Sequence, residues 1–315
     1  MNSKKAYAHG GFTAYLSFLK KDFIRHRGLY IMFLPVIIYF ILFHYAPMYG
    51  AQIAFKDFTP SRGIERSVFV GLKHFDSFFN GLYFFRLLKN TLLISLLQML
   101  FGFPAPIILA LLMNELRNKV FKRFVQTVTY LPYFVSLVVV CSLVINFVSY
   151  DGLINDVIAF FGGERASLLL EAGNYRTIHI LSGIWQNMGW NSIVYISALS
   201  SIDQQLYEAA VIDGAGRWKQ TLHVTLPGIL PTIVIMLIMR LGQVMNVGFE
   251  KIILLYNDAT LETADVISTF VYRRGLLEAS YSFSSAVGLF NSVVNTILLV
   301  GANTISNKLN ETSLF

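Results

Sequence analysis

The stretch LYEAAVIDGAGRWKQTLHVTLPGILP, residues 206–231, interrupts a strongly apolar part of the chain. Charged and small residues stand here between two apolar runs. Ser201 or Asp203 can cap a helix over DQQLYEAAVID, and Gly214 supplies the left-handed residue that ends such a helix. The stretch therefore predicts a helix followed by a sharp turn.

The rest of this stretch predicts a second short helix. We expect AGRWKQTLHV to be helical and LPGILP to stop it, with Pro227 and Pro231 in the first turn of the next helix. The result is a helix–turn–helix that projects from a membrane into the cytoplasm. An ordinary capped loop is the alternative that local chemistry leaves open.

The composition is that of a membrane protein. Of the 315 residues, 55% are hydrophobic and only 14% are charged, whereas about a quarter of a soluble domain is charged. The net charge of +7 does not indicate nucleic acid binding, because the basic residues cluster beside apolar runs, where they orient a membrane protein. The single cysteine, Cys141, lies in an apolar run; it excludes an internal disulfide and predicts a packing role.

Long stretches without Asp, Glu, Lys or Arg mark the predicted spans. A helix needs about 20 residues to cross the hydrocarbon core. We expect an all-α membrane protein with six transmembrane helices, at 29–49, 89–113, 124–148, 177–199, 229–250 and 281–304.

Basic residues predict the orientation. Six of them precede the first span, and the link 114–123 adds four more. This pattern favours a multi-pass membrane protein with both termini cytoplasmic. The link 50–86 opposes it, since it would lie outside and yet carries five basic residues.

The predicted domains follow from these spans. Residues 1–28 are expected to form a cytoplasmic interfacial helix, because Phe12, Tyr15, Leu16, Leu19 and Phe23 recur at helical spacing; a disordered basic tail is the alternative. Residues 29–307 are expected to form one six-helix transmembrane domain that includes the charged loop 201–227, and residues 308–315 are expected to form a cytoplasmic tail. The late, long first apolar run does not predict a cleavable signal peptide.

Residues 208–227 resemble the EAA signature of ABC importer permeases. That signature is EAA, three residues, Gly, nine residues, Ile, any residue, Leu and Pro, and this chain departs from it only with Val224 in place of Ile. The resemblance implies a coupling helix that sits in a cleft of a separate ATPase, with Glu208 making the charged contact and Gly214 setting the bend. The implied coupling residues are Glu208, Ala209, Ala210, Asp213, Gly214, Leu226 and Pro227.

Further stretches, among them GIWQNMGWNSIVYISALSSID and NVGFEKIILLYN, are similar to permeases of the carbohydrate-uptake branch that serves polysaccharides and complex oligosaccharides. This implies the type I importer fold, alternating access and a location in the bacterial plasma (inner) membrane. It also implies four kinds of protein or small-molecule partner beside membrane lipid: a second homologous permease subunit, two cytoplasmic ATPase subunits, an extracellular solute-binding protein and an oligosaccharide. The chain itself has no phosphate-binding loop, so we expect it to be no enzyme and to bind no cofactor or metal, with ATP and Mg on the partner ATPases.

Polar residues inside predicted spans are candidates for the substrate path, because such groups are costly in a bilayer. Spacings of three, three and four predict that Arg240, Gln243, Asn246 and Glu250 share one helix face. Aromatic and amide side chains on the fourth predicted span suit sugars, although interfacial anchoring is an alternative for the tryptophans. The remaining candidates are Trp185, Asn187, Trp190, Asn191, Asn291 and Asn295, of which the last two are expected to bond neighbouring helices.

Two other classes of function are alternatives to an importer permease. The six histidines are scattered without metal-ligand spacing, which argues against an intramembrane enzyme. A secondary carrier or channel for a polar solute is the alternative function, although no inverted repeat is evident and a coupling loop would have no purpose there.

Overall fold

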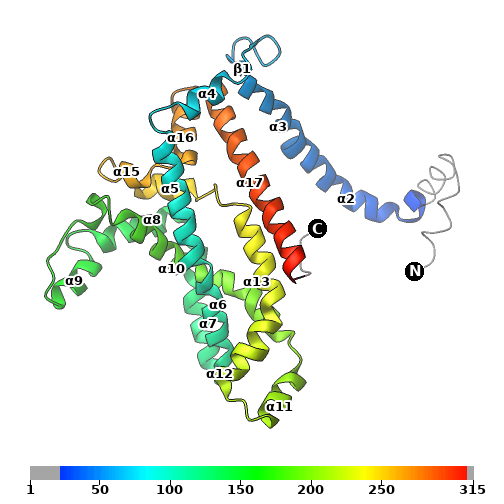
Figure 1. Cartoon of the computed structure of the whole chain (residues 1–315), viewed down its shortest axis with the longest axis vertical. Coiled ribbons are helices and arrows are strands. Elements are labelled where there is room, and N and C mark those ends of the chain that lie inside the picture. The colour runs from blue at the N-terminus through cyan, green and yellow to red at the C-terminus, as the bar shows by residue number, and fades with distance from the viewer. Residues whose placement is uncertain (1–21, 311–315) are drawn as a thin grey trace.

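The computed structural model describes residues 22–310, and this part of the chain is a bundle of helices with one short β-ribbon (Figure 1). Segments labelled η are π or 3-10 turns. In chain order the elements are α2 (Arg27–Phe40), η1 (Ile41–Tyr45), α3 (Ala46–Met48), η2 (Tyr49–Phe55), β1 (Lys56–Asp57), β2 (Val68–Phe69), α4 (Lys73–Phe79), α5 (Phe84–Leu97), η3 (Gln98–Gly102), α6 (Pro104–Glu115), α7 (Lys119–Phe134), α8 (Leu137–Val148), α9 (Leu153–Phe160), η4 (Leu168–Leu170), α10 (Tyr175–Ser200), α11 (Gln204–Ile212), α12 (Arg217–Gln220), η5 (Thr221–Thr225), α13 (Leu226–Leu241), α14 (Phe249–Leu255), α15 (Leu261–Ala264), α16 (Ile267–Tyr272), η6 (Arg273–Leu277) and α17 (Tyr281–Asn310).

Five helical segments of the described chain are long and apolar enough to cross a membrane. They are Arg27–Phe55, Phe84–Glu115, Leu137–Phe160, Arg217–Leu241 and Tyr281–Lys308. The predicted span at 177–199 coincides with α10, a helix of 26 residues, whose polar residues make it less apolar than these five. The all-helical prediction is confirmed, and the count of six spans stays a prediction.

Two predicted span boundaries are wrong. The span at 124–148 is two helices, because α7 ends at Phe134 and α8 starts after Ser136, whose side chain accepts a hydrogen bond from the Val139 N–H (3.4 Å). The span at 229–250 is interrupted too, since α13 ends at Leu241 and α14 starts only at Phe249.

The helix expected to stop at LPGILP does not stop. The chain is helical without a break from Arg217 to Leu241, through α12, η5 and α13. Pro231 lies inside α13 rather than in a first turn.

Three of the prolines within continuous helical segments are each preceded by a π turn. η1, η3 and η5 each end two residues before a proline, Pro47, Pro104 or Pro227. A proline ring clashes with the carbonyl four residues earlier, and a π turn moves that carbonyl away. The residue before each proline donates its N–H to the carbonyl five residues earlier: Ala46 to Ile41, Phe103 to Gln98, and Leu226 to Thr221.

α10 is the centre of the bundle, and it packs against α6, α7 and α13. It approaches α7 so closely that a Cβ on Gly189 would lie 2.0 Å from the Thr129 carbonyl oxygen. Buried clusters flank it on both sides. One, around Ile94, Ile180 and Ile252, includes the free thiol of Cys141; another, near α11, includes Tyr195 and Ile229.

The first spanning segment leans away from the rest of the bundle (Figure 1). None of the most apolar stretch of Arg27–Phe55 is buried inside the chain. Its last part, η2, packs against α17 and α4. The interfacial helix predicted from Phe12 onward lies almost entirely outside the described residues, and α17 continues through Asn310, into the segment predicted as a tail.

The close approach at Gly189 yields a stability prediction. Gly189→Ala forces α7 and α10 apart, because the added methyl group meets backbone rather than a movable side chain. We expect the free energy of unfolding to fall by about 1–3 kcal/mol. The measurement is the thermal unfolding midpoint of the purified protein in lipid nanodiscs. Gly288→Ala, in α17 with nothing within 4 Å of its Cβ position, is the control and is expected to leave the midpoint unchanged or raised. Equal midpoints for the two variants would contradict the close packing of α7 on α10.

Candidate functional site

The helix–turn predicted at residues 203–214 is present. The Asp203 side chain accepts a hydrogen bond from the Gln205 N–H (2.9 Å) at the start of α11. Gly214 adopts the left-handed conformation (φ +72°), which ends the helix at little cost. The Ala215 N–H then donates to the Ala210 carbonyl (2.8 Å). Cap and turn thus fix both ends of α11.

Few contacts hold α11 and α12 to the bundle. Tyr207 and Thr225 share a hydroxyl–hydroxyl hydrogen bond (3.0 Å), and Arg217 pairs with Glu115 at the end of α6 (3.2 Å). No residue of α11 is buried. Both helices lie at one end of the molecule (Figure 1). They therefore form a projecting element that is held to the bundle by these two side-chain hydrogen bonds and by the packing of Tyr207 against the buried cluster of Tyr195 and Ile229.

The exposed surface of this element mixes an acid with apolar side chains. Glu208 and Ala209 are exposed, as are Asp213 and Gly214. Ile212 is 86% exposed and Trp218 is 74% exposed. Apolar side chains this exposed at a protruding end are typical of a surface that binds another protein. Leu226 and Pro227, by contrast, lie in the first turn of α13, where Pro227 follows the π turn.

The predicted common face of Arg240, Gln243, Asn246 and Glu250 does not exist. Arg240 is in the last turn of α13, Gln243 and Asn246 lie in the non-helical segment 242–248, and Glu250 is in α14. Gly248, in the left-handed conformation (φ +73°), starts α14. All four side chains are exposed in the isolated chain. The sequence period failed here because the apolar run continues across the break.

The segment 242–248 is held by side chains of two neighbouring helices. Asn295 accepts a hydrogen bond from the Met245 N–H (3.0 Å), and Asn291 donates to the Met245 carbonyl (3.4 Å). Ser95 of α5 donates to the Val244 carbonyl. Asn291 and Asn295 were expected to bond neighbouring helices, and their partner is instead the non-helical backbone freed by the helix break.

Polar groups from four elements meet beside Gly183 of α10. Arg240 donates to the Gln98 side-chain oxygen (2.7 Å). The Lys251 ammonium donates to the His179 carbonyl (3.1 Å), and both it and the Gln98 amide nitrogen lie within 4 Å of the Gly183 Cβ position. Lys251 is only 8% exposed, and no carboxylate pairs with it among residues 22–310.

Gln98 and Lys251 were not predicted as site residues from the sequence. The available signal was at Lys251, a charged residue that is directly followed by the apolar run IILL. Lys251 is buried and charged in a membrane protein, and such residues face interior paths or cavities rather than lipid. Together with Arg240 it makes this region of the bundle basic.

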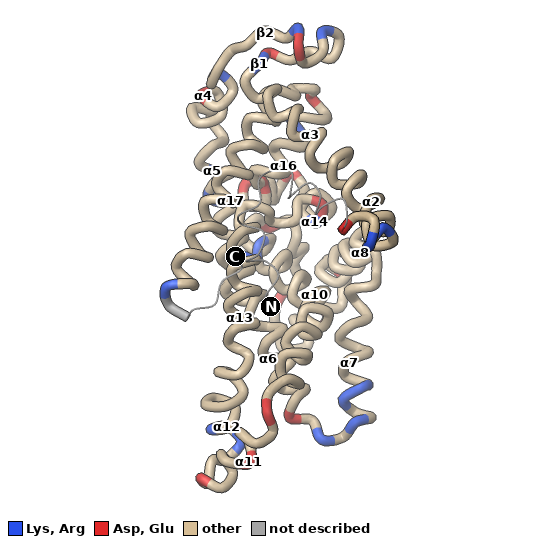
Figure 2. The backbone as a smooth tube through the Cα atoms, turned by 90° about the vertical axis from the view of Figure 1, so that its right-hand side faces the viewer, with Lys and Arg blue, Asp and Glu red and all other residues tan. Residues whose placement is uncertain are grey.

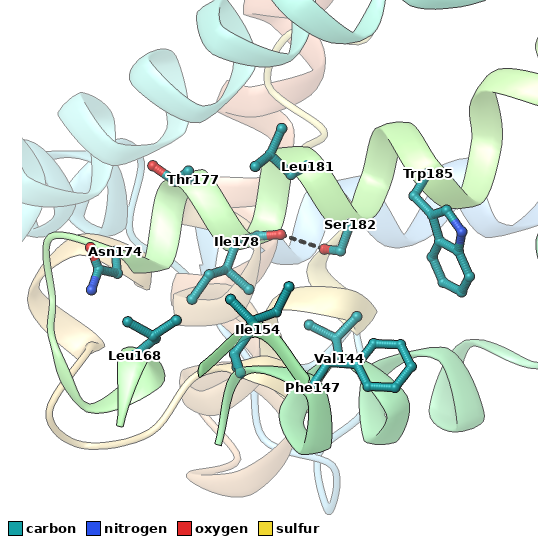
Figure 3. A pocket seen from close by; sticks show the side chains of 11 residues that line it. Val144, Phe147, Ile154, Leu168, Asn174, Thr177, Ile178, Leu181, Ser182 and Trp185 are labelled. Carbon is teal, nitrogen blue, oxygen red and sulfur yellow. Dashed lines mark hydrogen bonds between the residues drawn. The ribbon is translucent and has the colours of Figure 1, made fainter. Parts of the chain in front are cut away.

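The candidates on α10 do not converge. Trp185 lines a cavity of about 420 Å³ between α8, α9 and α10, whose other walls are mostly apolar (Figure 3). Trp190 stacks on Tyr133 of α7 instead, with ring centroids 4.7 Å apart. Asn187 donates to the Gly183 carbonyl of its own helix (2.9 Å), and Asn191 is exposed.

Comparison with known proteins identifies a matching family and similar relatives. A family model described as "Binding-protein-dependent transport system inner membrane component" matches residues 102–308. Protein LplB of Bacillus subtilis (strain 168) is 44% identical over 303 residues, which cover 96% of this chain and 94% of the relative. The polygalacturonan/rhamnogalacturonan transport system permease protein YteP of the same organism is 46% identical over 293 residues, with 93% and 91% covered.

The fold is also similar to that of solved transporters. A chain in the crystal structure of a bacterial ABC transporter involved in the import of the acidic polysaccharide alginate superimposes with a TM-score of 0.86 at 45% identity. The match covers 93% of this chain and 99% of the other. The same values hold for the crystal structure of a bacterial alginate ABC transporter in complex with a periplasmic protein that carries alginate pentasaccharide.

The bonds at Met245 yield the second prediction. Asn295→Leu removes the acceptor for a backbone N–H inside the bundle, and an unsatisfied buried donor costs about 1–3 kcal/mol. We expect a lower thermal unfolding midpoint in nanodiscs. Thr296→Val is the matched control, because within residues 22–310 that hydroxyl bonds only the Ser292 carbonyl of its own helix (2.8 Å). An Asn295 variant as stable as the Thr296 variant would show that the break does not depend on this bond.

Proposed function

This chain belongs to the family of binding-protein-dependent transport system inner membrane components, and from that membership we propose that it is one permease subunit of an ATP-driven importer of oligosaccharides. The match over 102–308 includes the projecting element, the broken helix and α17. The fold is that of a type I ABC importer permease. The observation that carries the proposal is the exposed α11–α12 element, which has the cap, turn and spacing of an ATPase-coupling helix.

We propose that α11 and α12 dock in a separate cytoplasmic ATPase. Glu208 supplies the charged contact, and Ala209 and Ala210 permit close approach of the partner. Ile212 and Trp218 supply the apolar surface that such an interface buries. ATP and Mg bind to that partner and not to this chain.

A second permease subunit completes the pore. The support is the first spanning segment, Arg27–Phe55, which leaves its own bundle with its apolar side chains unburied (Figure 1). A lone apolar helix in lipid gains packing by contacting another helix bundle. A related six-span partner offers such a bundle.

The orientation follows the charges. Lys and Arg gather where α7 begins and around α12, at the same end of the molecule (Figure 2). Basic residues at this end favour a cytoplasmic location. The chain is then a multi-pass protein of the plasma membrane with both termini inside, and α9, α15 and the β1–β2 ribbon lie outside, where an extracellular binding protein delivers the sugar.

The relatives indicate the substrate class. The permease YteP is named for polygalacturonan and rhamnogalacturonan, and a solved neighbour for the acidic polysaccharide alginate. We propose an oligosaccharide for this chain as well. The candidate path runs past Arg240, Gln98 and Lys251, which offer donors for sugar hydroxyls or carboxylates, and alternating access between two helix packings moves the sugar inward.

Affinity purification of the tagged chain from its native membranes, followed by mass spectrometry, tests this proposal. We expect an ATPase and a second six-span protein in near-stoichiometric amounts. Uptake of oligosaccharides by vesicles containing the purified complex and its binding protein is the second readout. Recovery of a homo-oligomer without an ATPase would overturn the proposal in favour of a carrier or channel.

Glu208→Lys is the third prediction. Reversing a charge at a desolvated interface weakens binding by several kcal/mol, so we expect at least about tenfold less ATPase retained on the purified chain. Membrane insertion should be normal, because Glu208 is exposed and its side chain makes no hydrogen bond or ion pair within residues 22–310. Glu164→Lys makes the same charge change at an exposed glutamate between α9 and α10 and should retain the ATPase. Full retention in both variants would contradict the docking role.

A further inference from the structure

A cavity that the candidate path does not use lies where α5, α10 and α15 meet. Its volume is about 420 Å³. Three cations line it, Arg86, Lys89 and Arg176, against one carboxylate, that of Glu262. We call it the basic pocket. It lies near the starts of α5 and α10, at the ends that face away from α11 and α12 (Figure 1).

Buried side chains fix the shape of the basic pocket. Asp265, whose side chain is fully buried, pairs with Arg86 (3.3 Å) and with Arg273 (2.6 Å). Asn90, also buried, donates to the carbonyls of Glu262 (2.8 Å) and Asp265 (2.9 Å). Its side-chain oxygen accepts a hydrogen bond from Arg176 (2.8 Å). Both arginines are therefore held in place before any ligand arrives.

The charges of this region do not balance. Arg86, Lys89, Arg176 and Arg273 face two carboxylates, those of Asp265 and Glu262, which leaves an excess of two positive charges. Lys89 has no hydrogen bond or ion pair within residues 22–310. The Nε atoms of Arg86 and Arg176 are buried and have no hydrogen-bond partner. Lys89 is exposed, so its ammonium is accessible to a ligand. A buried arginine donor without a partner is costly, and a nearby anion offsets part of that cost.

The positions of these arginines in first helical turns do not stabilise their helices. Arg86 lies in the first turn of α5 and Arg176 in the first turn of α10. The positive end of the helix dipole disfavours cations in a first turn and favours a bound anion there. Two helix N-termini and three cations thus act on the same space, and each favours negative charge.

We propose that the basic pocket binds a carboxylate of an acidic oligosaccharide as the sugar enters the permease, so that the substrate class is uronate-containing. This inference rests on the proposed function. The planar guanidinium groups of Arg86 and Arg176 match a carboxylate, and an excess of two charges suits one or two sugar carboxylates. Under the orientation proposed above, the pocket opens on the side from which the binding protein delivers.

Lys89 is the residue to change, because it lines the pocket without supporting Asp265 or Asn90. Lys89→Gln removes its charge, and Lys89→Arg keeps it. Arg62→Gln is the control: it removes one charge from an exposed position between β1 and β2, on the same side of the molecule. Since the same binding protein serves every variant, differences between them report on this chain.

The experiment measures uptake by the assembled transporter in phosphatidylcholine vesicles. The substrates are trisaccharides of galacturonate, mannuronate and guluronate, each compared with its methyl ester, which has the same sugar without the charge. Neutral trisaccharides of galactose and mannose complete the set.

We expect Lys89→Gln to raise the half-saturating concentration for the transported uronate about tenfold, the effect of losing one charge-assisted hydrogen bond. Uptake of the ester should not change. Lys89→Arg should restore the wild-type value, and Arg62→Gln should behave as the wild type for both substrates.

Other outcomes overturn the inference in different ways. An equal effect on uronate and ester, or no effect, would show that the pocket binds no substrate carboxylate. An effect that appears only when phosphatidylglycerol is added would assign the pocket to a lipid phosphate. Transport of the neutral trisaccharides alone would reject the uronate class and leave the importer function intact, whereas a complex without an ATPase and without any uptake would reject both.

Discussion

The backbone of a membrane-spanning helix must satisfy its own N–H and C=O groups, because hydrocarbon offers no partners. This chain departs from regular helix at several places, and each departure has a partner for the freed groups. At Pro47, Pro104 and Pro227 a π turn rearranges the hydrogen bonds locally. At 242–248, where helix is lost altogether, Ser95, Asn291 and Asn295 replace the missing bonds from outside.

The same constraint explains why polar residues concentrate on the inner helices. Ser95, Asn291 and Asn295 serve the backbone of the break, and Lys251 donates to the His179 carbonyl of α10. α10 itself carries buried polar side chains such as Gln186 and Ser192, and it is the helix most surrounded by others. Polar groups cost less free energy at these positions because protein, not lipid, surrounds them.

Features that depend on neighbouring residues were predicted correctly from the sequence, whereas contacts between residues far apart in the sequence were not. The Asp203 cap and the Gly214 turn follow from side-chain chemistry within a few residues, and both are present. The break after Leu241 was missed, because apolar residues continue through it and its stabilising partners, Ser95 and Asn295, lie about 150 and 50 residues away in the sequence. The basic pocket was missed for the same reason: Arg86 pairs with Asp265, 179 residues away in the sequence, and Arg176 donates to Asn90, 86 residues away.

The continuous helix from Arg217 to Leu241 connects the projecting element with the candidate substrate path. At 1.5 Å per residue, its 25 residues extend about 37 Å. One end carries α12 and the contact of Arg217 with Glu115, and the other ends at the break 242–248. The π turn η5 and Pro231 are the places where this helix can bend, and the break at its far end is held by side-chain hydrogen bonds, which rearrange more readily than helical backbone. Under the docking proposed above, motion of the partner would be carried along this helix to Arg240 and to the segment beside Lys251.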